Sequence, residues 1–470
     1  MVFSSAIFLF VFFPAVFILY HIVPGLKAKN IILIVASLVF YSFGQPEYLF
    51  LLLVSVFINY AAGWALTGAK YRKRILAVAV LLNVGLLSVF KYLDFAMDNI
   101  NSLFGMSVPL PGIVLPIGIS FYTFQGMSYI IDVYRDRFMG TRNFAKLILY
   151  ISFFPQLIAG PIIKYHDVAA MIDNRECTAE KTASGLRRFI IGLSKKLLLA
   201  NTAGAVADQV FALDAGSLDI RIAWLGAVCY TLQIYFDFSG YSDMAIGMGR
   251  IFGFHFLENF NYPYISTTIQ EFWRRWHISL SSWFRDYLYI PLGGSYCGKA
   301  RTVFNKFVVF FTTGLWHGAN WTFVLWGLWH GIFSMLEDIG IIPRKKIQGR
   351  IVGHIYTLLI VILGFTLFRA ETLSQAGIMF SQMFAGFGFT PETDQILHDL
   401  LSNTNIVMII LSIVLSVDWL PRIRGRIGSL SVEKQVLWTS VSYAAVFILF
   451  IYDILNLSQA TFNPFIYFQF

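Results

Sequence analysis

The stretch LWHGANW, residues 315–321, places chemically active side chains inside an otherwise apolar run. The imidazole of His317 can gain or lose a proton near neutral pH, and the amide of Asn320 can orient a ligand. Ionisable groups in membrane-buried segments are costly and by default mark pathways or sites. A core histidine bonded to a backbone carbonyl is the alternative, but the neighbouring glycines and tryptophans, Trp316 among them, favour a walled cavity.

A second WHG occurs at Trp329–Gly331. On one continuous helix, the thirteen residues from His317 to His330 would turn the two rings about 220° apart. Neither histidine has a carboxylate or thiolate ligand nearby in sequence, so we expect no metal site. His330 is interpreted as structural.

Residues 271–294, EFWRRWHISLSSWFRDYLYIPLGG, mix basic and aromatic side chains. This composition is typical of an amphipathic segment at the cytoplasmic membrane interface. An interfacial anchor would explain it, but a patch with Arg275, Trp276 and His277 could also hold an anionic, nucleotide-bearing donor. Composition leaves both interpretations open.

Two further stretches are polar for their expected depth in the membrane. Asp237, Tyr241 and Asp243 interrupt one hydrophobic run, and Gln125 and Asp132 interrupt another. Such groups could orient a histidine or a hydroxyl acceptor, or they could pair with cations on neighbouring helices. We expect the pairing role for the two carboxylates at 132 and 243.

The elements that must position these residues are membrane helices. Of the 470 residues, 57% are hydrophobic and 13% are charged, about half the roughly 25% charge of a soluble domain. Apolar runs of about 20 residues recur along the chain. The sequence therefore predicts an all-α polytopic membrane protein, a single integral membrane domain over residues 1–470 with roughly 11–13 transmembrane or re-entrant helices.

Charge patterning gives the expected topology. The net charge of +9 falls in short basic loops that alternate with loops lacking Lys and Arg, which favours a cytoplasmic side for the basic loops rather than nucleic-acid binding. The N-terminus and the acidic residues 370–404 are then outside. Three distant cysteines indicate neither a disulfide framework nor a zinc site. The candidate spans lie near residues 3–20, 30–43, 47–67, 75–93, 113–133, 145–162, 186–210, 220–252, 303–340, 351–369, 405–420 and 436–457.

The segment 303–340 has basic residues at both ends, so the chain must enter the membrane and return. It has about 34 apolar residues for two crossings that need roughly 40. We therefore expect a turn at partial depth, near GLWHGAN. Non-helical backbone at that depth is tolerated where it is buried in protein or lines a cavity, so His317 is predicted at a cavity floor.

Several stretches together resemble the membrane-bound O-acyltransferase family, in its bacterial polysaccharide-modifying branch. They are FYTFQGMSYIIDVYR, FFPQLIAGPI, QIYFDFSGYSDMAIG, residues 259–294 and GLWHGANWTFVLWGLWHG. The opening FSSAIFLFVFFPAVFILYHIVP and the closing FIYFQF also look like the alginate-modifying members. The resemblance covers nearly the whole chain.

This resemblance implies helices around a central funnel or tunnel, with peripheral helices in residues 1–109 and 341–470 and a catalytic core in 110–340. It places the family's catalytic histidine on His317 and its second signature position on His277. The further candidates for substrate binding are Trp316, Asn320, Gln125, Asp237, Tyr241, Trp276 and Arg275.

The implied reaction moves an acetyl or other short acyl group from a thioester to a hydroxyl. We expect acetyl-CoA as a substrate rather than a bound cofactor, and a cell-surface polysaccharide such as alginate or peptidoglycan as the acceptor. The location implied is the bacterial cytoplasmic (inner) membrane. A periplasmic or extracellular acetyltransferase resembling an SGNH hydrolase is the expected partner.

A hydroxyl is a poor nucleophile at neutral pH, so this chemistry needs a general base. We expect His317 to deprotonate the acceptor and His277 to help position the thioester or the acceptor. In a variant, a covalent acyl-histidine carries the group. The alternatives are D-alanyl transfer to teichoic acid and a transporter or flippase without chemistry. Inverted repeats would favour a transporter, and the sequence shows no convincing one.

Overall fold

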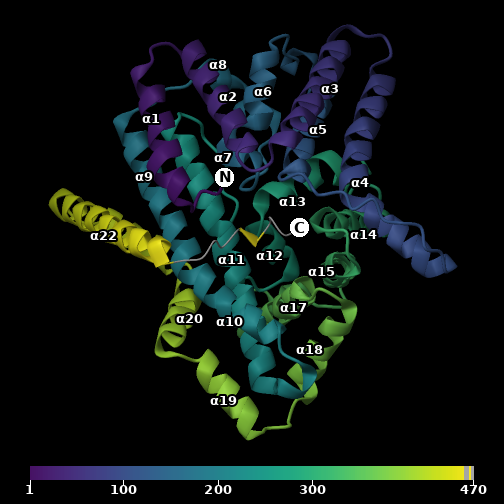
Figure 1. The fold of residues 1–470 in the computed structure, drawn as a ribbon, viewed down its shortest axis with the longest axis vertical. Coiled ribbons are helices and arrows are strands. Elements are labelled where there is room, and N and C mark those ends of the chain that lie inside the picture. The colour runs from purple at the N-terminus through teal and green to yellow at the C-terminus, as the bar shows by residue number, and fades with distance from the viewer. Residues whose placement is uncertain (460–464, 467–470) are drawn as a thin grey trace. The chain divides into compact units, whose positions relative to one another are not determined.

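The computed structural model describes residues 1–459, 465 and 466, which are mainly helical (Figure 1). No β-strand occurs among these residues. Among the described residues, five helices are long and apolar enough to cross a membrane: Pro46–Gly68, Arg72–Phe104, Ala179–Phe211, Ile351–Arg369 and Val432–Leu457. A bent pair, Pro391–Leu400 with Asn403–Leu415, would make a sixth if it is one span. The predicted all-helical membrane protein is confirmed, whereas the total of roughly 11–13 passes stays a prediction.

The chain divides into two compact units, whose boundaries differ from the three segments predicted from the sequence. The N-terminal unit comprises residues 1–189 and 242–258. Its helices are η1 (Phe8–Phe12), α1 (Phe13–Ile22), α2 (Leu26–Ser42), η2 (Pro46–Tyr48), α3 (Leu49–Gly68), α4 (Arg72–Phe104), α5 (Ile119–Arg135), η3 (Arg137–Met139), α6 (Phe144–Ser152), α7 (Phe154–Leu157), α8 (Tyr165–Asp173) and most of α9 (Ala179–Ser194).

Helices α3, α4 and α5 pack against one another in the N-terminal unit. Asn59 on α3 and Asn83 on α4 exchange two amide hydrogen bonds of 3.0 Å, which satisfy both side chains within an apolar environment. At the end of the pair, the Arg72 guanidinium donates to the carbonyls of Val133 and Tyr134, both at 2.8 Å. These hydrogen bonds hold the three helices side by side.

The carboxylates expected to pair with cations do so. Asp132 Oδ2 lies 2.9 Å from His166 Nδ1, and Asp243 Oδ1 accepts from Arg188 Nη2 at 2.7 Å. Arg188 also pairs with Glu258. The structural interpretation of both carboxylates is confirmed.

The C-terminal unit comprises residues 190–241 and 259–470. After α9 its helices are η4 (Lys195–Ala200), α10 (Asn201–Phe211), η5 (Ala215–Ser217), α11 (Ile220–Ile251, which continues into the other unit), η6 (Pro263–Ile265), α12 (Ile269–Arg275), α13 (Ile278–Phe284), η7 (Arg285–Tyr289), α14 (Lys299–His317), α15 (Trp321–Ile339), α16 (Arg344–Ile347), α17 (Ile351–Arg369), α18 (Leu373–Ala385), α19 (Pro391–Leu400), α20 (Asn403–Leu415), α21 (Trp419–Gly428) and α22 (Val432–Gln459).

Helices α14 and α15 form a tight hairpin, because glycines on both let the backbones touch. A Cβ on Gly314 would lie 2.5 Å from the Phe323 carbonyl oxygen, and one on Gly327 would lie 2.4 Å from the Phe310 carbonyl oxygen. Close approach through small residues is the usual device for helix pairs in membranes. The break falls at residues 318–320, inside the predicted GLWHGAN turn.

Several predicted spans differ from the observed helices. The segment 145–162 is not one span, because α6 ends at Ser152 and α7 is a separate short helix. The span 75–93 is part of α4, which continues to Phe104, and the loop expected at 370–404 contains α18 and α19. The prediction for 351–369 coincides with α17. Residues 467–470 of the closing FIYFQF motif lie outside the described residues.

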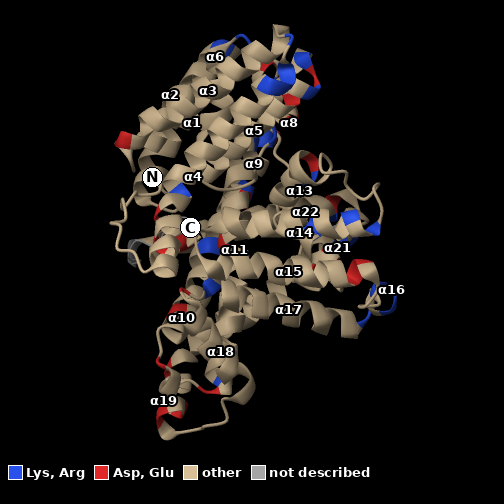
Figure 2. Cartoon of the chain, turned by 90° about the vertical axis from the view of Figure 1, so that its right-hand side faces the viewer, with Lys and Arg blue, Asp and Glu red and all other residues tan. Residues whose placement is uncertain are grey.

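Charged residues separate within the C-terminal unit. Figure 2 shows basic residues at α16 and acidic residues on α19, at different ends of this unit. The basic residues are Arg344, Lys345 and Lys346, and the acidic ones include Glu392 and Asp394. This separation agrees with the predicted alternation of basic and acidic loops.

Candidate active site

His317 is the last residue of α14, where Gly318 turns the chain into an extended conformation. Its side chain is buried, with 3% of its surface exposed. Three aromatic rings surround the imidazole, with centroids at 4.8 Å (Trp316), 4.8 Å (Trp326) and 5.2 Å (Phe368). Two tryptophans therefore adjoin His317, as expected, and the chain turns directly after it. Its place at a cavity floor stays a prediction.

His277 lies between α12 and α13 and has a left-handed backbone conformation, with φ 43°. A non-glycine residue adopts this conformation only where its surroundings enforce it. Asn259 enforces it here. Its carbonyl oxygen accepts from the Ile278 amide at 2.9 Å, and its Oδ1 accepts from the Ser279 hydroxyl at 2.8 Å.

The same Asn259 Oδ1 lies 3.1 Å from His277 Nδ1. Because that oxygen is an acceptor for Ser279, the His277 tautomer that fits has its proton on Nδ1 and its lone pair on Nε2. Phe238 packs its ring edge-on to the imidazole at 4.5 Å. Orientation and tautomer of this fully buried histidine are thus both set by its neighbours.

The two predicted catalytic histidines meet at one indole. Trp316 has its ring centroid 6.1 Å from that of His277 and 4.8 Å from that of His317. Two imidazoles and an indole from α14 and the α12–α13 turn therefore share one buried aromatic compartment. Such a compartment excludes water, which strengthens hydrogen bonds and charge interactions within it.

Helix α12, which carries the chain to His277, is held by a buried carboxylate from α15. Glu337 accepts hydrogen bonds from the amides of Ile269 (2.6 Å) and Gln270 (3.1 Å), which are unsatisfied at a helix N-terminus. Thr268 caps the same end by accepting from the Glu271 amide at 3.0 Å. A negative charge at a helix N-terminus also interacts favourably with the helix dipole.

The interpretation of residues 271–294 as an interfacial anchor is wrong for the part around His277. Trp276 is 1% exposed and packs among Phe272, Phe260 and Phe365. Arg275 is part-buried, with Nε donating to Glu271 at 3.0 Å. In this conformation the indole has a packing role and the guanidinium an intrahelical ion pair. A substrate-binding role for either stays a prediction.

Asp237 and Tyr241, on α11, contact the C-terminal tail of the chain. Asp237 is 1% exposed, pairs with Lys196 at 2.6 Å, and accepts from the Ile466 amide at 2.7 Å. The ring of Phe465 stacks on Tyr241, with centroids 4.5 Å apart. The tail also reaches the His277 neighbourhood, since Phe465 lies 5.7 Å from the Phe238 ring.

Asn320 and Gln125 have different surroundings. Asn320 caps α15 by accepting from the Thr322 amide at 3.1 Å, and its Nδ2 donates to the Glu371 carbonyl at 2.8 Å. Gln125 belongs to the N-terminal unit, on α5, and is fully buried. Neither polar atom of its side chain has a hydrogen-bond partner among the described residues. The amide of Asn320 is therefore occupied by hydrogen bonds, and a role of Gln125 in substrate binding stays a prediction.

The argument that His330 and His317 point apart rested on one continuous helix and is wrong. The break at 318–320 places the two residues on different helices, and both rings pack on Trp326, at 4.8 Å for His317 and 5.3 Å for His330. His330 is fully buried and also stacks on Phe272 at 5.9 Å. Neither of its ring nitrogens has a hydrogen-bond partner within residues 1–459, 465 and 466.

Sequence reasoning missed Asn259, the residue that orients His277. It lies eighteen positions before His277, in NFNYPYI. Its role depends on the fold, which brings the two segments side by side. The signal was its place within a stretch that resembles the family. In the part of the chain that the structure describes, no group of three His, Cys, Asp or Glu side chains is arranged to hold a metal ion.

Residues 48–342 match the sequence profile of the membrane-bound O-acyltransferase family. The chain belongs to this family. The acyltransferase is 40% identical to a Pseudomonas putida protein named "Probable alginate O-acetylase AlgI", over the whole of both chains. It is 36% identical to the peptidoglycan O-acetyltransferase of Helicobacter pylori, covering 80% of this chain and 78% of that one. A teichoic acid D-alanyltransferase of Bacillus subtilis is 30% identical over 46% of this chain and 57% of its own.

Proposed function

We propose that this acyltransferase moves an acetyl group from acetyl-CoA to hydroxyl groups of an extracytoplasmic polysaccharide. The observation that carries the proposal is the compartment in which His277 and His317 both contact Trp316. The relatives that cover most or all of both chains are named for O-acetylation of alginate and peptidoglycan. Alginate, the polymer named for the relatives that align over the full length, is the first acceptor to test.

In the proposed reaction, His317 takes the proton of the acceptor hydroxyl as its oxygen attacks the thioester carbonyl. A C–O bond forms, the C–S bond breaks, and the proton passes to the departing thiolate, so that the free thiol and the ester are the products. His277, held by Asn259, offers its Nε2 as a positioning group. Exclusion of water by the surrounding aromatic rings protects the thioester from hydrolysis.

A covalent variant uses the same residues in two steps. His317 attacks the thioester and releases the thiol, and the acyl-imidazole then transfers its acetyl group to the hydroxyl. The two routes differ in one observable, a labelled protein that forms without acceptor. Rapid quench after mixing the enzyme with labelled acetyl-CoA separates them.

The proposed setting is the bacterial cytoplasmic membrane, with acetyl-CoA on the side of the basic loops. The separation of basic α16 from acidic α19 in Figure 2 supports this orientation. The acceptor lies on the opposite side and receives the acetyl group directly or through a partner acetyltransferase there, resembling an SGNH hydrolase. D-alanyl transfer has weaker support, because the D-alanyltransferase matches less than half of this chain.

The test uses the full-length enzyme in proteoliposomes with radiolabelled acetyl-CoA and alginate as the acceptor, and a D-alanyl carrier-protein thioester as a parallel donor. Wild type is expected to consume acetyl-CoA, and His317→Ala is expected to reduce this by at least about 100-fold, the lower end for loss of a general base. His398→Ala, an exposed histidine on α19, is the matched control and should act like wild type.

Three outcomes contradict the proposal. If the wild type neither hydrolyses nor transfers the acetyl group, acetyl-CoA is not its donor. If only the D-alanyl thioester is consumed, the substrate class is that of the D-alanyltransferases. Movement of a lipid-linked glycan without any thioester cleavage would favour a flippase.

A further inference from the structure

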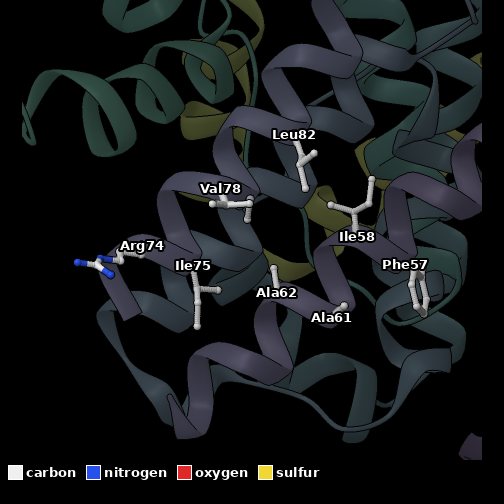
Figure 3. A pocket seen from close by; sticks show the side chains of 9 residues that line it. Phe57, Ile58, Ala61, Ala62, Arg74, Ile75, Val78 and Leu82 are labelled. Carbon is white, nitrogen blue, oxygen red and sulfur yellow. The ribbon is translucent and has the colours of Figure 1, made fainter. Parts of the chain in front are cut away.

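An apolar groove runs between α3 and α4 in the N-terminal unit. It has a volume of about 440 Å³ and is lined by Phe57, Ile58, Ala61, Ala62, Arg74, Ile75, Val78, Ala79 and Leu82. Figure 3 shows the lining side chains on two neighbouring helices, with the charged Arg74 at one end. The function proposed above does not use this groove.

Small residues create the groove, and hydrogen bonds hold its two helices together. The alanines at 61, 62 and 79 leave space where larger side chains would fill the helix interface. The reciprocal Asn59–Asn83 pair holds α3 and α4 in contact just beyond it. The groove is therefore built into the helix pair.

The length and composition of the two helices predict that the groove faces lipid. Both helices are long and apolar enough to span a membrane, and little of their most apolar windows is buried inside the protein, 33% for Pro46–Gly68 and 17% for Arg72–Phe104. Phe57 and Val78 are 60% and 56% exposed. Between Arg74 and Leu82 the groove follows α4 for about 12 Å, close to the ~15 Å depth of one leaflet.

The charged end of the groove is expected at the membrane surface. Lys70, Arg72, Lys73 and Arg74 form the basic loop expected on the cytoplasmic side. Arg72 is occupied with backbone carbonyls at 2.8 Å. Arg74 is exposed and lines the groove, and its guanidinium lies 5.2 Å from the centroid of the Tyr71 ring. Figure 3 shows its guanidinium at one end of the groove, turned away from the other lining side chains.

We propose that the α3–α4 groove binds one anionic phospholipid, with an acyl chain along Ala61, Ala62 and Val78 and its phosphate on Arg74. The occupant follows from the two chemistries of the groove, an apolar channel as deep as a leaflet and a cation at its surface end. Basic pockets between transmembrane helices on the cytoplasmic side recognise acidic lipid headgroups in this way. The bound lipid stabilises the α3–α4 pair.

The experiment titrates the purified full-length protein in neutral detergent with phosphatidylglycerol or phosphatidylcholine and counts bound lipid by native mass spectrometry. Wild type is expected to bind phosphatidylglycerol about fivefold more tightly, the factor for roughly 1 kcal/mol from one basic residue. Arg74→Gln removes this preference. Lys73→Gln, an exposed neighbour that does not line the groove, retains it. Ala62→Leu fills the groove and reduces binding of both lipids.

Three results overturn the proposal. The first is equal affinity of wild type for the two lipids. The second is loss of the preference in Lys73→Gln to the same extent as in Arg74→Gln, which would indicate diffuse surface charge. The third is full competition by soluble glycerol phosphate, which would indicate an anion site that needs no acyl chain. If Arg74→Gln does not purify in folded form, Ala62→Leu and the competition decide.

Discussion

The left-handed turn at His277 gives a sharp prediction, because one side chain supports it. Asn259 Oδ1 lies within hydrogen-bonding distance of His277 Nδ1, the Ser279 amide and the Ser279 hydroxyl, at 3.1, 3.2 and 2.8 Å. The substitution Asn259→Ala removes this acceptor from a buried site. The Ser279 hydroxyl can rotate to donate to another acceptor. The His277 imidazole and the Ser279 amide lose the acceptor oxygen to which they donate.

The magnitude follows from the cost of buried donors without partners. At about 1–3 kcal/mol for each of two donors, the substitution lowers the free energy of unfolding by about 2–6 kcal/mol. Loss of the bond that sets the tautomer and orientation of His277 lowers the transfer rate by about 5- to 150-fold, the same 1–3 kcal/mol in the transition state. Asn259→Asp retains the acceptor oxygen and should recover much of the rate.

The assay is the initial rate of acetyl transfer from labelled acetyl-CoA in proteoliposomes, over a range of donor concentrations and pH. Asn261→Ala, an exposed asparagine in the same loop, is the control. If Asn259→Ala and Asn261→Ala are equally active, His277 needs no orientation by Asn259. If alanine and aspartate at 259 lower the rate equally, the effect is one of stability rather than of the histidine.

Two further predictions concern other parts of the chain. Phe465→Ala removes the ring that stacks on Tyr241. We expect a loss of about 3–5 kcal/mol in stability, measured by thermal unfolding in detergent, and an unchanged midpoint would contradict the packing of the tail. The hydrogen bond to Asp132 raises the pKa of His166 above its usual value of 6.5. Its stabilisation is therefore complete below about pH 6.5 and is lost as pH rises through the raised pKa. His166→Gln should destabilise at pH 6 and progressively less at higher pH, whereas a pH-independent difference would refute this linkage.

The parts of the fold that could be predicted are those whose signals are local. The break between α14 and α15 was predictable because glycines and polar residues interrupt an apolar run between basic flanks. The segment 351–369 coincides with α17 because Arg350 bounds a run without internal charges. Pairing of Asp243 was expected from the cost of a charge at that depth, although its partner, Arg188, was not.

The features that could not be predicted depend on residues far apart in the sequence. The bond between Asn259 and His277 requires that two irregular segments meet. The contact of Phe465 with Tyr241 joins positions more than two hundred residues apart. His330 was predicted to point away from His317 because a continuous helix was assumed. The three-residue break places the two histidines on different helices, where both pack on the same tryptophan.

The central claim is that His317 is the base in an acyl transfer to a surface polysaccharide. The most direct measurement is the ester-linked acetate on that polysaccharide, isolated from cells whose own copy is replaced by wild type or His317→Ala at equal membrane abundance, and quantified by NMR. The account predicts that acetate falls to the level of cells lacking the protein, at least about 100-fold below wild type. Acetate at more than half the wild-type level in His317→Ala would contradict it.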